Sequence, residues 1–367
     1  MMSKHIAFFG SSLLSAYWNG AATYYRGILA ALAKRGHRIT FYEPDAYERQ
    51  RYRDMPAPSW ANVIVYPCSD ATSVRRCLDA ARHADIVIKA SGVGVFDEFL
   101  EAAVANLAGE GPMVVFWDVD APATLARVQQ ATDDPFRRLI PRYDLILTYG
   151  GGPAVVAKYK TLGAKACVPI YNGLDPSTHY PVPASAELSA DLVFLGNRLP
   201  DRETRVDHFF FEAARQLPEK RFLLAGSGWE SKPRPTNVHL VGHVFTHQHN
   251  ALNASAEFVL NINRDSMATT GYSPPTRVFE AAGAGACIIT DEWDGIEAFF
   301  RPGREILIAS DVGALVQHLQ HQTPERRTAI GAAARARALQ DHTYGKRAYQ
   351  VERALEASFQ ARVEAPA

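Results

Sequence analysis

The chain has 367 residues, of which 47% are hydrophobic and 21% are charged, and its formal net charge at pH 7 is zero. This balance excludes a strong overall field that would attract nucleic acid or an anionic membrane. The length exceeds what one hydrophobic core usually serves, so we expect two domains. The four cysteines lack metal-binding spacing, and no signal peptide or membrane-spanning apolar run is recognisable. We therefore expect a cytoplasmic protein with reduced thiols.

The first half of the chain alternates buried strand patterns with helical patterns. This alternation predicts a doubly wound parallel α/β sheet. Ligands of such sheets bind in the loops that follow the carboxyl ends of the strands. We expect strands at residues 5–9, 37–42, 63–66, 85–89, 113–117, 145–148 and 168–170, and helices at 21–35, 73–82, 96–107 and 123–130.

A proline-rich segment without apolar periodicity divides the two halves. We interpret residues 171–190 as an interdomain linker between an N-terminal Rossmann-like domain (1–170) and a second one (191–345). Residues 346–367 are expected to form a terminal helix that can pack back on the first domain. In the second domain we expect strands at 192–195, 222–225, 238–242, 258–261, 287–290 and 305–308, with helices at 202–216, from 276 and from 312 onward.

A short helix rich in alanine and glycine is expected to follow the adjacent prolines Pro274 and Pro275, with Ser273 near its start. The free N–H groups of its first turn and the helix dipole favour an anion, most often a phosphate. Arg277 adds a cation, and Glu280, one turn further on, can accept hydrogen bonds from two sugar hydroxyls. Together they predict a nucleotide-diphosphate site. An ordinary capped helix with a surface arginine and glutamate fits the same residues.

The second half resembles the GT-B glycosyltransferases, and more closely the group that includes the spore-maturation CgeB proteins, over roughly residues 191–348. The resemblance implies two Rossmann-like domains that face each other across a cleft. It also implies a nucleotide-sugar donor held mainly by the second domain and an acceptor held mainly by the first. The motifs that carry the resemblance are, in order, FLGN (194–197), LAGSG (224–228), VGHV (241–244), TRVFEA (276–281), FFRPGRE (299–305) and HTY (342–344) with Arg347.

The resemblance also implies roles for particular residues. Glu280 matches the family carboxylate that bonds the donor ribose, Arg277 belongs to the diphosphate-binding turn, and the peptide 242–244 matches the strand end that pairs with the base. The retaining subgroup has a second glutamate eight residues earlier, where this chain has Tyr272, so stereochemistry and sugar identity do not carry over. With Arg198, which is inferred from its place after a strand end, the expected donor-binding residues are Gly196, Arg198, Gly226, Ser227, Gly242, His243, Val244, Ser273, Pro274, Thr276, Arg277 and Glu280.

Two aspartates follow a predicted central strand, in the sequence Asp118-Val119-Asp120. Such a pair can hold a divalent cation on a donor diphosphate. Because Arg277 offers positive charge from the protein itself, we expect no metal cofactor. A carboxylate at this strand end suits a general base that deprotonates the acceptor, with Asp120 as the first candidate and Asp118 as the second. A cap for the helix near Pro122 explains either residue equally well.

Other polar residues allow a functional and a structural interpretation. Arg198 and Arg202 follow the first strand end of the second domain, where they can reach a leaving diphosphate or lie on a helix surface. Asn19 and Gly20, in the loop after the first strand, are acceptor-side candidates or parts of a plain turn. The nearby aromatic residues can stack on a sugar or belong to the core. These are Tyr17, Trp18, Tyr24 and Tyr25.

Three histidines, His243, His247 and His249, fit no common zinc pattern, so we interpret them as loop residues. The whole sequence predicts a metal-independent glycosyltransferase of the hexosyltransferase type. It would move a sugar from a nucleotide-diphosphate donor to a glycan, small molecule or protein. The alternatives are a nucleotide-sugar 2-epimerase and a non-catalytic nucleotide-sugar-binding protein. We expect no nucleic-acid partner and no transmembrane segment, and a weak membrane contact through the arginines of the terminal helical region is a further alternative.

Overall fold

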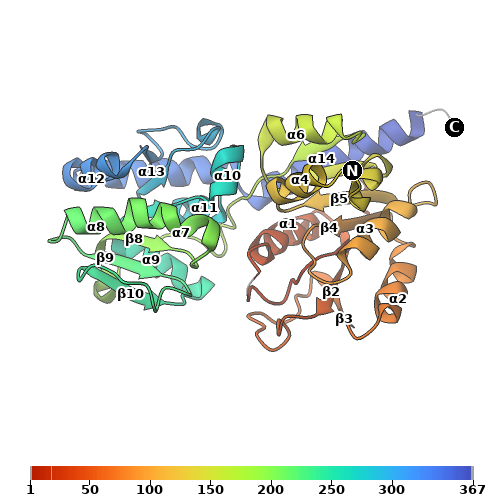
Figure 1. Ribbon diagram of the computed structural model, residues 1–367, viewed down its shortest axis with the longest axis horizontal. Helices are drawn as coiled ribbons and strands as arrows, with labels where there is room; N and C mark the ends of the chain where they lie inside the picture. The colour runs from red at the N-terminus through yellow and green to blue at the C-terminus, as the bar shows by residue number, and fades with distance from the viewer. Residues whose placement is uncertain (1, 18, 365–367) are drawn as a thin grey trace. The chain divides into compact units, whose positions relative to one another are not determined.

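A computed structural model describes residues 2–17 and 19–364 of the chain (Figure 1). The chain forms two compact units. Unit 1 comprises Met1–Tyr171 and Tyr344–Ala367, and unit 2 comprises Asn172–Thr343. Unit 2 is therefore inserted between two parts of unit 1. The segment expected as a linker, 171–190, lies with unit 2 from Asn172 onward.

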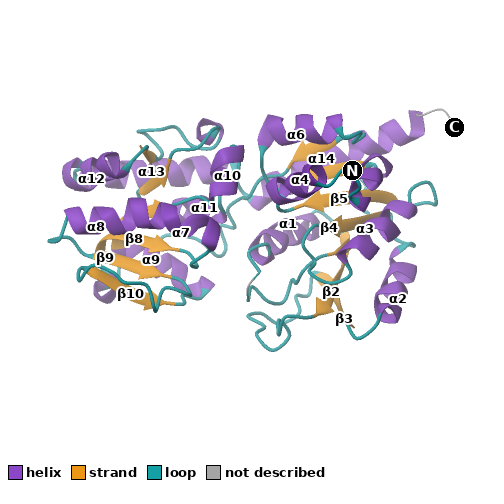
Figure 2. Ribbon diagram, viewed as in Figure 1, coloured by secondary structure: helices purple, strands orange, loops and turns teal. Residues whose placement is uncertain are grey.

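Unit 1 is built on a seven-stranded sheet with the order β3-β2-β1-β4-β5-β6-β7, in which all neighbouring strands are parallel. The central strands β1, β4 and β5 are almost entirely buried and mostly apolar, because helices cover both faces of the sheet (Figure 2). The strands are β1 His5–Phe9, β2 Arg38–Asp45, β3 Ala61–Pro67, β4 Ile86–Ala90, β5 Met113–Asp118, β6 Leu145–Thr148 and β7 Cys167–Pro169.

The helices of unit 1 enclose one hydrophobic cluster on each face of this sheet. One cluster contains side chains of α2, α3, α4, α5 and α6, and the other contains side chains of α1 and of the C-terminal helix α14. The terminal helix thus packs on the first unit, against α1. The helices are α1 Ala22–Lys34, α2 Ala71–Ala81, α3 Asp97–Asn106, α4 Ala121–Gln130, α5 Pro135–Leu139, α6 Gly152–Thr161 and α14 Tyr344–Glu364, with a 3₁₀ turn η1 at Ile140–Arg142.

Unit 2 has a six-stranded sheet with the order β10-β9-β8-β11-β12-β13, again with parallel neighbours. Its strands are β8 Ala190–Leu195, β9 Phe222–Ala225, β10 Val238–Gly242, β11 Ala256–Asn261, β12 Ile288–Asp291 and β13 Leu307–Ala309. Its helices are α7 Pro200–Val206, α8 Glu212–Gln216, α9 His249–Ser255, α10 Asp265–Thr270, α11 Thr276–Ala284, α12 Val312–His321 and α13 Pro324–Asp341, with short turns η2 Ala186–Leu188, η4 Thr246–Gln248 and η5 Ile296–Ala298.

The expected helix at 202–216 is interrupted in the structure. A π-helical turn, η3 at Asp207–Phe211, separates α7 from α8. Its three adjacent phenylalanines are all buried in the core of unit 2, which one regular helical face cannot achieve for consecutive residues. The two α/β units with parallel sheets were predicted, and this π turn was not.

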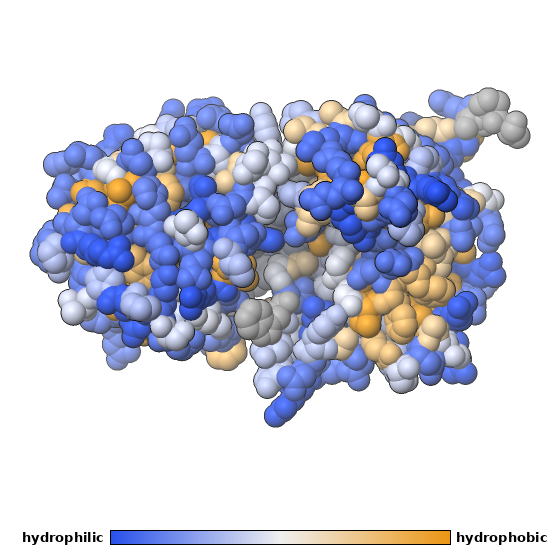
Figure 3. All heavy atoms as spheres, viewed as in Figure 1, coloured by the Kyte–Doolittle hydropathy of each residue, from blue (hydrophilic) through white to orange (hydrophobic). Residues whose placement is uncertain are grey.

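The surface of both units is mostly hydrophilic on the face that Figure 3 shows, with hydrophobic residues gathered chiefly around α2 and α3 of unit 1. The large apolar side chains lie instead in the clusters that cover the two sheets. None of the described helices combines the length and the hydrophobicity needed to span a membrane.

Candidate active site

The carboxyl ends of three neighbouring strands of unit 2 form a glycine-lined edge. Gly196 N–H donates to Ala225 O (2.9 Å), and Gly226 N–H donates to Gly242 O (2.7 Å). Gly226 has φ +118°, and a Cβ atom at this position would collide with the carbonyl of Gly196. Ser227 N–H donates to Asn197 Oδ1 (3.0 Å). The predicted residues Gly196, Gly226, Ser227 and Gly242 are therefore adjacent in space.

A strained turn precedes α11. Tyr272 has φ +45°, a conformation that costs a non-glycine residue about 1–2 kcal/mol. Its N–H donates to Asp294 O (2.6 Å), and its ring packs against Gly295. Ser273 is buried, and its hydroxyl donates to Gly271 O (2.9 Å). These contacts fix the chain just before the predicted anion-binding turn.

The first turn of α11 has Pro275 at its N-cap, and no side chain caps it. Asn172 Nδ2 donates to Pro274 O (3.3 Å), which holds the entering chain in place. Thr276 begins the helix, so the backbone N–H groups at this end have no partners within α11. This is the geometry that an anion at a helix N-terminus requires. Phosphate binding at this turn remains a prediction.

Arg277 and Glu280 meet on one face of α11. Arg277 Nη1 lies 2.8 Å from Glu280 Oε2, and Glu280 is only 5% exposed. Burial alone raises the pKa of Glu280, but the charge of Arg277 and the nearby His179 and His249 outweigh it, so this pKa lies well below its usual value. Glu280 is therefore an anion at neutral pH.

The charged pair still has unused hydrogen-bonding capacity. Although Arg277 Nη1 and Glu280 Oε2 are close, neither has a partner with hydrogen-bond geometry among the described residues, and Arg277 Nε has none either. Buried polar atoms in native proteins are usually hydrogen-bonded. A polar ligand at this position would satisfy these atoms.

Arg202 lies near Arg277. Burial and then repulsion from Arg277 lower the pKa of Arg202 to about 10. Its Nη2 donates to the carbonyl of Asn197, and its guanidinium packs over the Phe194 ring, while its buried Nε has no hydrogen-bond partner among the described residues. The nearby Arg198, by contrast, forms a two-bond ion pair with Glu203, both bonds 2.7 Å long. Arg202 is thus better placed than Arg198 to use its charge on a ligand.

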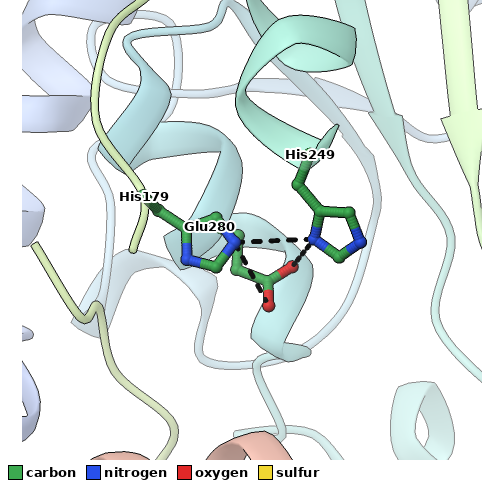
Figure 4. Close-up of side chains that lie close together, drawn as sticks. All are labelled: His179, His249 and Glu280. Atoms are coloured by element: carbon green, nitrogen blue, oxygen red, sulfur yellow. Dashed lines mark hydrogen bonds and ion pairs between the residues drawn. The ribbon is translucent and has the colours of Figure 1, made fainter. Parts of the chain in front are cut away.

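Two histidines that the sequence analysis did not connect with Glu280 complete the cluster (Figure 4). His179 Nε2 lies 3.8 Å from Glu280 Oε1, and His249 Nδ1 lies 3.6 Å from Glu280 Oε2. His249 was expected in a loop, but it starts α9, which packs against α11. His179 comes from the proline-rich segment, whose backbone approaches α11 so closely that a Cβ on Gly283 would lie 2.8 Å from His179 O. Burial lowers the pKa of His179.

Unlike the residues of this cluster, most of the residues that follow β10 are exposed. His243 and His247 are exposed and flank the exposed Phe245, with ring centroids 4.6 and 5.9 Å from it. Val244 is buried, and Gly242 has φ +78°. Their backbone contact with a base remains a prediction.

In unit 1, Asp118 lies at the end of β5 and is completely buried. Its carboxylate accepts hydrogen bonds from Ser91 Oγ (2.8 Å), Thr124 Oγ1 (2.9 Å), Tyr159 Oη (2.5 Å) and the N–H of Asp120 (3.1 Å). Burial raises the pKa of Asp118, although these bonds act against the rise. Four protein donors on a buried carboxylate favour a structural role for Asp118.

Asp120 differs from Asp118. It is half-buried at the start of α4, and its side chain makes no capping bond to that helix. The cap-like bonds near this helix start come from Asp118, which binds both the N–H of Asp120 and the Thr124 hydroxyl. Asp120 therefore remains the better candidate for a base.

Some of the acceptor-side candidates have structural contacts within unit 1. Asn19 is buried, its Oδ1 accepts from Ser11 Oγ (2.9 Å), and its Nδ2 donates to two carbonyls of its own loop, so its side chain holds the loop together. Gly20 is exposed and open around its Cα. Tyr24 and Tyr25 belong to the core. Tyr17 stacks on Tyr52 at 4.2 Å, and Trp18 lies outside the described residues.

Comparison with known proteins agrees with this fold. Residues 202–353 match the family described as "Glycosyl transferase-like". A structure of Anabaena HepE with UDP and glucose is 14% identical, with a TM-score of 0.68, over 96% of this chain and 100% of that chain. Sucrose-phosphate synthase from Thermosynechococcus elongatus is 14% identical, with a TM-score of 0.67, over 98% of this chain and 100% of that chain.

An alpha-glucosyltransferase in complex with UDP is 10% identical, with a TM-score of 0.69, over 97% of this chain and 100% of that chain. The comparison with curated proteins finds no match. The predicted GT-B fold is confirmed by these structures and by the two parallel sheets. The family match confirms the prediction of a glycosyltransferase-type enzyme. The closer relation to the CgeB group remains a prediction.

Proposed function

We propose that the protein is a metal-independent glycosyltransferase that uses a nucleotide-diphosphate sugar. The observation that carries this proposal is the charged cluster of the half-buried Arg202 and Arg277 and the buried Glu280, beside the uncapped start of α11. All three residues lie within the segment that matches the glycosyl transferase-like family. The structures of similar fold include complexes with UDP, so UDP is the first nucleotide to test.

Each member of the cluster has a distinct chemical task in this proposal. Arg277 and Arg202 would neutralise the donor diphosphate, and they would stabilise the charge that develops on it as the glycosidic bond breaks. Their hydrogen-bonding atoms without partners suit phosphate oxygens. Because two guanidinium groups supply this charge, a divalent cation is not required. Glu280 is ionised, so it can accept bonds from the two ribose hydroxyls.

We further propose that Asp120 deprotonates the acceptor hydroxyl if the reaction inverts the anomeric centre. Its place after β5 supports this role, because ligands of parallel sheets bind beyond the strand ends. A positioned base of this kind typically contributes 10²–10⁴-fold to the rate. The acceptor would be a hydroxyl-bearing glycan, small molecule or protein.

The test is nucleotide binding, measured by calorimetry and thermal shift with UDP, GDP, TDP, ADP and CMP in the presence of EDTA. We expect one diphosphate to bind the wild type and to raise its Tm, because a ligand of the folded state stabilises it. Glu280→Gln and Arg277→Gln should each weaken binding about 10-fold or more, a loss of about 1.4 kcal/mol.

A matched control is available on α8. Arg215 and Glu212 have the same kind of ion pair, at 2.8 Å and one helical turn apart, but their side chains are 55% and 39% exposed. Glu212→Gln and Arg215→Gln should bind the nucleotide as the wild type does. Binding that needs a divalent cation, or that is insensitive to Glu280 and Arg277, would overturn the proposal.

A further inference from the structure

Three potential metal ligands converge in unit 2, from three separate segments of the chain (Figure 4). His179 Nε2 is 3.5 Å from His249 Nδ1 and 3.8 Å from Glu280 Oε1, and His249 Nδ1 is 3.6 Å from Glu280 Oε2. Ligands about 2.0–2.1 Å from a tetrahedral zinc ion lie roughly 3.3–3.4 Å from one another. Each of the three side chains offers one ligand atom, and these atoms all lie within 4.8 Å of one another, so side-chain movement alone would let them share one ion.

A hydrogen-bond partner on the second ring nitrogen can orient His179 in this cluster. The Thr178 hydroxyl lies 3.2 Å from Asp175 O and 2.9 Å from His179 Nδ1, and when it donates to Asp175 O it accepts from His179 Nδ1. With the proton on Nδ1, Nε2 presents its lone pair to His249 and Glu280. Metal-binding histidines commonly have such an oxygen partner on the second ring nitrogen, which orients the ring.

The two oxygens of Glu280 have different surroundings. Oε2 faces Arg277 Nη1 at 2.8 Å, and Oε1 faces His179. A carboxylate can bind a metal through one oxygen while the other contacts a cationic side chain. The nearby guanidinium lowers the affinity for a cation but leaves Oε1 for coordination.

We propose that His179, His249 and Glu280 form a binding site for one divalent transition-metal ion of the zinc type. Two imidazoles and one carboxylate match zinc, cobalt or nickel, whereas magnesium prefers oxygen ligands and retains several waters.

The site has a consequence that rests on the proposed function. A metal ion at this position occupies the carboxylate that would bind the donor ribose. Zinc would therefore act as an antagonist of nucleotide binding rather than as a cofactor. Glu280 cannot coordinate the metal ion and bind the donor ribose at full strength at the same time.

The experiment is a titration of the full-length protein with Zn²⁺, after treatment with EDTA and its removal, followed by calorimetry. Co²⁺ serves as a second probe because its visible absorption reports tetrahedral coordination. We expect one equivalent to bind. His179→Gln and His249→Gln should each weaken binding about 10-fold or more, since each removes one ligand. His247→Gln, an exposed histidine outside the cluster, should bind as the wild type does.

Circular dichroism and Tm check that each variant is folded, and if His179→Gln is unfolded, His249→Gln decides. The proposal is overturned if the wild type binds no metal, or if neither histidine variant weakens binding. Nucleotide binding in EDTA is measured separately, so failure of the metal site and failure of the glycosyltransferase proposal are distinguishable. If Zn²⁺ binds but does not weaken nucleotide binding, the antagonism is wrong.

Discussion

Two buried carboxylates, Asp118 in unit 1 and Glu280 in unit 2, have opposite environments. Asp118 is fully buried and accepts four hydrogen bonds from neutral donors. Glu280 is nearly as buried, but its neighbours are Arg277 and two histidines, and one of its oxygens has no hydrogen-bond partner among the described residues. Burial raises the pKa of Asp118, whereas the pKa of Glu280 is lowered because the surrounding charge outweighs burial.

The difference separates a structural carboxylate from one prepared for a ligand. The donors around Asp118 join β4, β5, α4 and α6, so the carboxylate links parts of the unit to one another. The charges around Glu280 are concentrated, and their hydrogen-bonding capacity is incompletely used. Functional sites often retain such unsatisfied groups at a cost in stability. Burial alone does not distinguish the structural role of Asp118 from the proposed ligand-binding role of Glu280.

The largest expected effect on catalysis is that of Glu280→Gln on sugar transfer. If Glu280 holds the donor ribose, kcat/KM should fall about 100-fold or more, equivalent to about 2.7 kcal/mol. The unfolding free energy should change by only about 1 kcal/mol, because the isosteric amide keeps the packing of α11. Release of the nucleotide from its sugar donor and urea unfolding measure the two quantities. A large loss of stability with unchanged transfer would reverse the roles of the two carboxylates.

Asp118→Ala should show the opposite pattern. It leaves the hydroxyls of Ser91, Thr124 and Tyr159 and the N–H of Asp120 without their acceptor. Each buried unsatisfied donor costs about 1–3 kcal/mol, and partial relaxation leaves an expected loss of about 3 kcal/mol in urea unfolding. Asp120→Ala is the neighbouring control, since these four bonds are accepted by Asp118 and not by the Asp120 side chain. Its unfolding free energy should lie within about 1 kcal/mol of the wild-type value. A larger loss would show that Asp120 has a structural role too.

A smaller effect concerns pH. Because the folded pKa of Asp118 is raised above its ordinary value of 3.8, its protonation stabilises the folded state. This contribution is complete below about pH 3.8 and is lost as the pH rises through the folded pKa. The unfolding free energy of the wild type relative to Asp118→Asn should therefore fall with rising pH from about pH 4, by at most about 1.4 kcal/mol per pH unit. A difference that increases with pH would show that the four donors outweigh burial.

Much of the fold could be predicted because most strands are largely apolar. The bounds of β1, β6, β9 and β10 agree with the predicted ranges. β1, β6 and β9 are buried almost throughout, as strands covered on both faces are, whereas the edge strand β10 alternates between exposed and less exposed residues. Helix positions were less certain at their ends. The short helices α9 and α10 were missed because neither has enough turns for an apolar period.

The candidate site could be predicted only where its residues are local in sequence. Arg277 and Glu280 are one helical turn apart, so their meeting follows from the period of the helix. His179 and His249 reach Glu280 through tertiary packing, from an aperiodic segment and from an unpredicted helix. Strand patterns also do not reveal that the Asp118 carboxylate accepts hydrogen bonds from side chains of three other segments.

The insertion of unit 2 into unit 1 has a consequence for the order of biosynthesis. A ribosome completes unit 2 at Thr343, before it makes α14, whose Tyr344, Val351 and Leu355 are buried in one cluster of unit 1. Burial of each such side chain is worth roughly 1.5–3 kcal/mol. Unit 1 is thus begun first and finished last. A chain stopped near residue 343 would contain the whole of unit 2 but would leave one face of the first sheet covered by α1 without α14.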